Sequence, residues 1–61
     1  MATYHLYYLN RGILVGSDDI EAADDVEAER VAAGRNHGRV VEVWNNHQRV
    51  GVIPPHVELA E

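Results

Sequence analysis

The chain has 61 residues, a formal net charge of −5, 46% hydrophobic residues and no cysteine. This composition excludes disulfides and thiolate metal sites, is too apolar for a disordered chain, and disfavours nonspecific binding to nucleic acid. Because a chain of this length buries only about 60% of its unfolded surface, we expect one small domain that gains stability from self-association or from a partner.

The first predicted element is an antiparallel hairpin. Residues 4–9 and 13–17 are rich in aromatic and aliphatic residues, and the segment between them ends in Gly12, which suits a left-handed position in a three-residue loop. That loop gives both faces of the hairpin apolar side chains, so we expect cover on both faces. The residues predicted beneath the helix are Tyr7, Leu9, Ile13 and Val15.

A single helix is predicted over about residues 24–33. Asp24 is a suitable N-cap, and Glu27 three positions later completes a capping box. Gly34 is predicted in the left-handed conformation just after the last turn. Strand character fades after Ser17, so the acidic residues beyond it are expected to precede or begin the helix. Seven of the ten acidic residues lie there: Asp18, Asp19, Glu21, Asp24, Asp25, Glu27 and Glu29.

The second predicted hairpin joins residues 39–44 to residues 48–53 through Asn45-Asn46, because asparagine tolerates the positive φ angles of a tight turn. Pro54-Pro55 ends the last strand, and residues 56–61 are expected to form a tail. The pairing parity of this hairpin predicts a valine surface beneath the helix, formed by Val41, Val43, Val50 and Val52.

These elements predict an α+β fold of the order β-β-α-β-β, with two antiparallel hairpins forming a four-stranded sheet and one helix on one face. One domain spans residues 1–61 and is expected to be ordered over about residues 3–55, while the strand order is left open. The N-terminus lacks the basic and apolar regions of a signal peptide, and no apolar run reaches about 18 residues. A cytoplasmic protein that does not span a membrane is therefore expected.

The chain carries more apolar residues than one short, alanine-rich helix can cover. The surplus exceeds what the surface of a soluble monomer usually carries, and tyrosine and tryptophan are enriched at interfaces. We therefore expect a homodimer, and the sequence indicates a non-catalytic protein-interaction module. The residues predicted for self-association are Tyr4, Leu6, Tyr8, Val40, Trp44 and Ile53.

The acidic segment predicts a second contact surface. Capping one helix requires fewer carboxylates than this segment carries. The segment contains no basic residue, and the first one after it is Arg30. We interpret the surplus as a recognition surface for a basic protein partner, with a merely solvated surface as the alternative. The predicted residues of this surface are Asp18, Asp19, Glu21, Asp25 and Glu29.

Catalytic and cofactor-dependent functions are not expected. Ser17 and Thr3 are the only hydroxyl nucleophiles besides the tyrosines, no Gly-rich phosphate loop occurs, and neighbouring carboxylates point apart. Metal binding is not expected either, because the four histidines lack ligand spacing, and only His37 and His56 can meet at one end of the second hairpin. The alternative function is a small nucleic-acid-binding or antitoxin-like regulator that uses Arg35, Arg39 and Arg49.

Several motifs resemble a group of short hypothetical bacterial proteins. The shared features are the Tyr-x-Leu-Tyr strand at residues 4–7, the acidic helix start at residues 20–28 and the Val-Glu-Val-Trp strand at residues 41–44. The resemblance covers about residues 4–53. It implies a compact structural module and assigns no catalytic residue.

Overall fold

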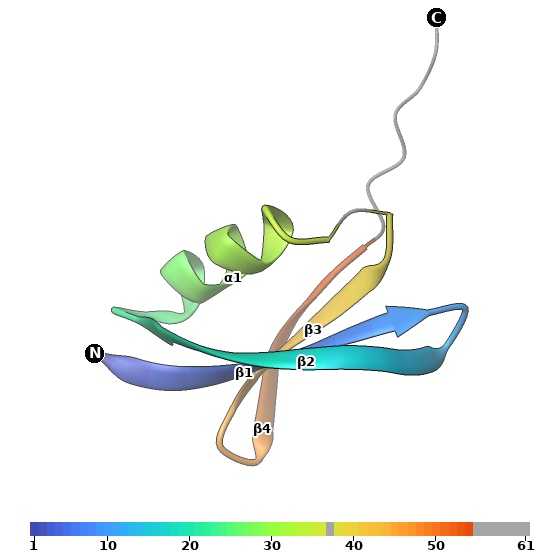
Figure 1. The fold of residues 1–61 in the computed structure, drawn as a ribbon. Helices are drawn as coiled ribbons and strands as arrows, with labels where there is room; N and C mark the ends of the chain where they lie inside the picture. The colour runs from blue at the N-terminus through green and yellow to red at the C-terminus, as the bar shows by residue number, and fades with distance from the viewer. Residues whose placement is uncertain (37, 55–61) are drawn as a thin grey trace, which may run out of the picture.

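The computed structural model describes residues 1–36 and 38–54. The four strands form one antiparallel sheet in the order β2-β1-β3-β4, and the helix lies on one face of it (Figure 1). The predicted α+β fold and its β-β-α-β-β order are confirmed. The predicted tail at residues 56–61 lies outside the described residues. The elements are β1 (Ala2–Asn10), β2 (Ile13–Ala22), α1 (Asp25–Ala33), β3 (Val40–Asn45) and β4 (Gln48–Ile53).

The loop of the first hairpin is shorter than predicted. Asn10 pairs with Ile13, which leaves only Arg11 and Gly12 in the turn, with φ angles of 55° and 79°. Two consecutive residues with positive φ match the twist of the flanking strands and favour this tight turn. A bulge then leaves Val15 without a partner in β1.

Strand β2 continues further than predicted, through the acidic residues to Ala22. Its second half pairs with the first half of β1, from Asp18 opposite Leu6 to Ala22 opposite Ala2. Because β2 is an edge strand, these carboxylates stay in water while their backbone completes the ladder. Charged side chains on an edge also discourage pairing with other chains. The prediction that strand structure fades after Ser17 is wrong, because pairing with β1 extends the strand through the acidic residues to Ala22.

The hydrophobic core lies between α1 and one face of the sheet. Leu6 and Val43 pair at its centre, and both are fully buried. Because side chains alternate along a strand, the even-numbered residues of β1 face the helix and the odd-numbered residues face away. The helix covers none of the four residues predicted beneath it in the first hairpin, Tyr7, Leu9, Ile13 and Val15. The buried apolar residues are Tyr4, Leu6, Tyr8, Ala22, Ala28, Ala32, Val41 and Val43.

The second hairpin confirms part of the predicted valine surface. Val41 and Val43 are fully buried beneath α1, and Val50 packs against the edge of the core. The two-residue turn lies one position later than predicted, and a bulge in β4 inserts Val50 as an extra residue. This shift turns Ile53 toward the core and leaves Val52 on the other face, where it is 45% exposed.

Asp24 is the N-cap of helix α1, as predicted, but Glu27 bonds back to the residue before the cap and not to the cap itself, so the capping box is only partly formed. Asp24 accepts a hydrogen bond from the backbone N–H of Glu27 at 2.8 Å, and the Glu27 carboxylate accepts one from the backbone N–H of Ala23 at 2.7 Å. The buried residues of the helix are both alanines, so small side chains bring it close to the sheet. Gly34 has a φ of −72°, so the prediction of a left-handed residue at the helix end is wrong.

A hydrogen bond joins β1 to the first turn of α1. The Tyr4 hydroxyl donates to Asp25 Oδ1 at 2.6 Å. This bond, together with burial of the ring, raises the pKa of Tyr4 from 10.0 to about 12. The neutral phenol is therefore favoured more strongly in the folded protein than in the unfolded chain.

We expect this hydrogen bond to make folding sensitive to alkaline pH. Below the ordinary pKa of 10.0 both states keep the Tyr4 proton, and stability falls as the pH rises toward about 12 because the unfolded chain releases its proton first. Burial and the bond to Asp18 raise the pKa of Tyr8 as well, which adds to the same loss. Urea unfolding of the wild type and of Tyr4→Phe across this interval should show a smaller loss in the variant. Equal losses would contradict the role of Tyr4.

Candidate functional site

The face of the sheet opposite α1, hereafter the open face, is the strongest functional candidate. Within residues 1–36 and 38–54, no element covers it (Figure 1). Two half-buried aromatic rings lie at its centre, from Tyr7 of β1 and Trp44 of β3. The apolar residues of the open face are Tyr7, Leu9, Leu14, Val40, Trp44 and Val52.

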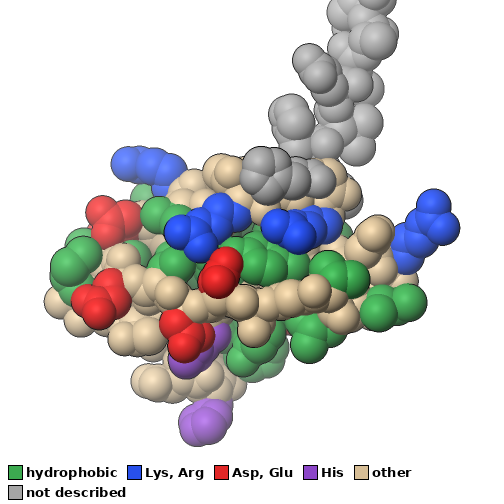
Figure 2. Space-filling view, viewed as in Figure 1, with side chains coloured by type: hydrophobic (Ala, Val, Ile, Leu, Met, Phe, Trp, Pro, Cys, Tyr) green, Lys and Arg blue, Asp and Glu red, His purple; other side chains and the backbone are tan. Residues whose placement is uncertain are grey.

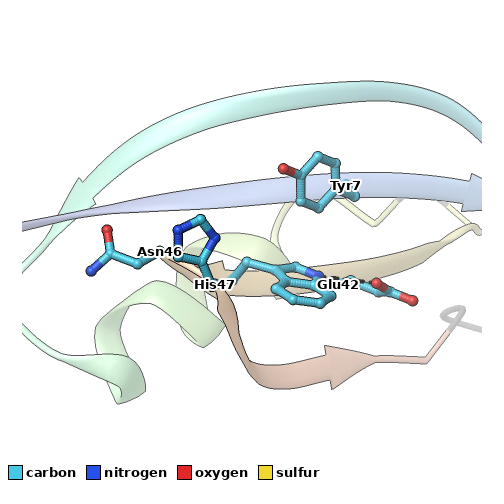
Figure 3. Close-up of a pocket in the computed structure, with 5 residues that line it drawn as sticks. Tyr7, Glu42, Asn46 and His47 are labelled. Carbon is cyan, nitrogen blue, oxygen red and sulfur yellow. Dashed lines mark hydrogen bonds between the residues drawn. The ribbon is translucent and has the colours of Figure 1, made fainter.

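A shallow depression of about 360 Å³ lies on this face. Tyr7 and Trp44 meet there edge to face, with ring centroids 6.3 Å apart and an interplanar angle of 82°. Figure 3 shows Tyr7 on β1, with Glu42 and His47 at opposite ends of the depression. The residues that line it are Tyr7, Glu42, Trp44, Asn46 and His47.

The polar groups of the depression hold the Trp44 ring in place. The Trp44 Nε1–H donates to Glu42 Oε1 at 3.0 Å, and Glu42 Oε2 lies 3.7 Å from Arg49 Nη1. Because Glu42 serves these two groups and lies far along the depression from His47, the pair does not form a convergent acid and base. The arrangement suits contact with another surface better than acid-base chemistry. The absence of catalysis stays a prediction.

The predicted acidic surface is divided between the two faces of the sheet. Asp18 points to the helix side, where it accepts hydrogen bonds from the Tyr8 hydroxyl at 2.7 Å and from Arg35 at 3.2 Å. Asp19 and Glu21 lie on the open face. Figure 2 shows acidic and Arg side chains close together on the side of the molecule formed by β2 and α1. Charges of both signs are therefore interspersed there.

The other two predicted acidic residues lie elsewhere. Asp25 accepts the hydrogen bond from Tyr4, and Glu29 lies over Gly51 of β4. An added Cβ at Gly51 would approach a Glu29 carboxylate oxygen to 2.9 Å, so the glycine leaves the space that this side chain occupies. The five carboxylates do not form one continuous surface. A basic protein partner stays a prediction from the sequence.

Most of the residues predicted for self-association belong to the core. Tyr4, Leu6 and Tyr8 are buried beneath α1, so their assignment to an exposed surface is wrong. Ile53 also packs against the core, because the bulge in β4 changes its facing. The three β1 residues face the helix because β1 lies beside the helix-facing valines of β3, and the sequence left that strand order open.

The other two residues predicted for self-association, Val40 and Trp44, lie on the open face. This face also holds Tyr7 and Leu9, which the sequence interpretation assigned to the core. One signal could have identified them. His5 is a polar residue in the middle of β1, and it marks the odd-numbered residues of this strand as the less buried set.

The arginines of the nucleic-acid alternative are separated by the sheet. Arg35 pairs with Asp18, and the Arg39 guanidinium stacks on the Tyr8 ring at 4.3 Å from its centroid. Both arginines lie on the helix side, whereas Arg49 lies on the open face. Binding of phosphates by all three requires one continuous basic surface. The geometry therefore gives this alternative no support.

Metal and membrane sites receive no support from the described part of the chain. No group of three or more His, Asp or Glu side chains there is placed to hold a metal ion. His37 and His56, the one pair for which the sequence left a shared ion open, lie outside the described residues. No helix among residues 1–36 and 38–54 is long and apolar enough to cross a membrane.

No protein-family model, no curated protein and no solved structure matches this chain. The resemblance to short bacterial proteins therefore stays a prediction. A function can therefore be inferred only from the residues of this chain. Its uncovered aromatic and apolar side chains lie together on the open face.

Proposed function

We propose that this chain is a non-catalytic protein-interaction module that self-associates through the open face. The observation that carries the proposal is the edge-to-face pair of Tyr7 and Trp44 at the centre of a sheet face that no described element covers. Large aromatic side chains contribute most where an interface excludes water, and they are enriched among the residues that dominate binding energy.

The surroundings of the aromatic pair support an interface. Leu9 and Val40 are half-buried beside it, and Leu14 and Val52 are exposed at 58% and 45%. Apolar side chains thus extend across all four strands. A face of this kind buries its apolar area against a second flat surface, as in stacked β-sheets. In a domain this small, such burial adds stability that a single helix does not supply.

Analytical ultracentrifugation tests the proposal. At about 10 to 100 μM we expect a mass of about twice the 6.8 kDa chain mass, falling on dilution as the dimer dissociates. Trp44 is the only tryptophan, so its fluorescence should become harder to quench with acrylamide as the concentration rises. A mass of 6.8 kDa at every concentration, with Trp44 quenchable throughout, would refute self-association.

A further inference from the structure

Side chains of both charge signs share one row across the open face. Residues directly opposite each other in adjacent strands place their side chains on the same face of a sheet. His5 pairs with Asp19 of β2 and with Trp44 of β3. Trp44 in turn pairs with Arg49 of β4. In strand order, the row is Asp19, His5, Trp44 and Arg49, with a carboxylate at one edge of the sheet and a guanidinium at the other.

Both charged ends of the row are accessible. The Asp19 side chain is 70% exposed and the Arg49 side chain is 54% exposed. Asp19 Oδ1 lies 2.7 Å from His5 Nδ1, and Arg49 Nη1 lies 3.7 Å from Glu42 Oε2. A carboxylate and a guanidinium each bind several partners at once, so these contacts leave capacity for a further ion pair.

A second copy of the chain can cover the open face in two aligned, symmetric ways. A two-fold axis parallel to the strands, between β1 and β3, stacks β2 of one copy on β4 of the other. A two-fold axis perpendicular to the strands stacks β2 on β2. Strand β2 contains no basic residue, so in the second arrangement the strand that faces Asp19 supplies no cation, whereas in the first arrangement the facing strand supplies Arg49. Opposite charges across an interface fix its register.

We propose that the open faces of two copies stack about the axis parallel to the strands, with Asp19 of each copy paired with Arg49 of the other. This arrangement rests on the proposed self-association. The same rotation places His5 over Trp44 of the second copy. Stacked sheets lie about 10 Å apart, a gap that a long arginine side chain can span. The dimer then has ion pairs at its margins and aromatic rings at its centre, which is the usual anatomy of an interface.

Charge reversal tests this pairing by sedimentation equilibrium. Asp19→Arg and Arg49→Asp each place like charges opposite one another, and each should raise the dimer dissociation constant by about tenfold or more. The double variant restores opposite charges and should return the constant to within about threefold of the wild type. Glu21→Arg is the control, because it makes the same charge change on the same strand and face, but the row of Glu21 ends at Thr3 and does not reach β3. Its dissociation constant should stay within about threefold of the wild type.

The possible failures are distinguishable. A wild-type mass of 6.8 kDa at all concentrations refutes self-association and this arrangement together. A wild-type dimer that the single reversals leave unchanged, or that the double variant fails to restore, overturns this arrangement alone. If circular dichroism shows that a reversed variant is unfolded, Asp19→Asn replaces it. Loss of the pair should then flatten the salt dependence of the dissociation constant, and an unchanged salt dependence overturns the arrangement.

Discussion

Replacing Leu6 with Ala is expected to remove a large part of the stability of the protein. Leu6 is 0% exposed at the centre of the core, where it pairs with Val43 beneath α1. Truncation of a fully buried leucine costs about 2 to 5 kcal/mol, and a domain of this size has roughly 3 to 9 kcal/mol in total. Thermal unfolding followed by circular dichroism should therefore show a melting temperature lower by about 10 °C or more.

Ile13→Ala is the matched control for this truncation. Isoleucine is an isomer of leucine, so the same number of atoms is removed, but Ile13 is 67% exposed beside the first turn. Its cost should stay within about 1 kcal/mol. Leu9→Ala tests the facing of β1, since Leu9 lies on the open face. If Leu9→Ala destabilised the protein more than Leu6→Ala, β1 would present its odd-numbered residues to the helix, and the assignment of the core would be wrong.

The order of the elements could be predicted because local signals define it. The capping residues Asp24 and Glu27 start the helix, and the turn glycine at position 12 separates two apolar segments. Such signals act within a few residues, so they do not depend on the rest of the fold. For the same reason, the turn of the second hairpin was located to within one residue.

The apolar residues of β1 do not indicate which face of this strand packs beneath the helix, and His5 is the one polar signal in its middle. Both of its faces are apolar, with Leu6 on one and Tyr7 on the other. The deciding fact is that β1 lies beside β3, whose Val41 and Val43 face the helix. Strand order depends on contacts between residues far apart in the sequence. Because side chains alternate, an error of one residue exchanges the two faces completely. The predicted core residues and the predicted self-association residues of this strand were therefore interchanged.

The two bulges limited the prediction of the candidate site in the same way. Each bulge adds one residue, Val15 in β2 and Val50 in β4, and changes the facing of the later residues in its strand. A glycine comes directly after each, Gly16 and Gly51, and a glycine within a strand often marks a bulge. The acidic half of β2 had no such signal. The pairing of this segment with β1 outweighs its low strand propensity. Its position at the edge of the sheet leaves the carboxylates in water.

Replacing Trp44 with Glu is expected to convert the proposed dimer to a monomer at micromolar concentration. Trp44 belongs to the central aromatic pair of the open face. Truncation of a large aromatic residue at the centre of an interface costs about 2 kcal/mol or more, and a carboxylate buried there without a partner adds a desolvation cost. The dissociation constant measured by sedimentation equilibrium should therefore rise by about 30-fold or more.

Val26→Glu is the control for the added charge, because Val26 is 64% exposed on α1, away from the open face. It gives the protein the same net charge as Trp44→Glu, so an effect shared by both variants comes from charge and not from the surface. Trp44→Gln separates loss of the ring from repulsion by the neighbouring Glu42 carboxylate, and it should also weaken the dimer. If both Trp44 variants fold, by circular dichroism, and dimerise as tightly as the wild type, then the open face is not the interface, and the dimer forms through another surface.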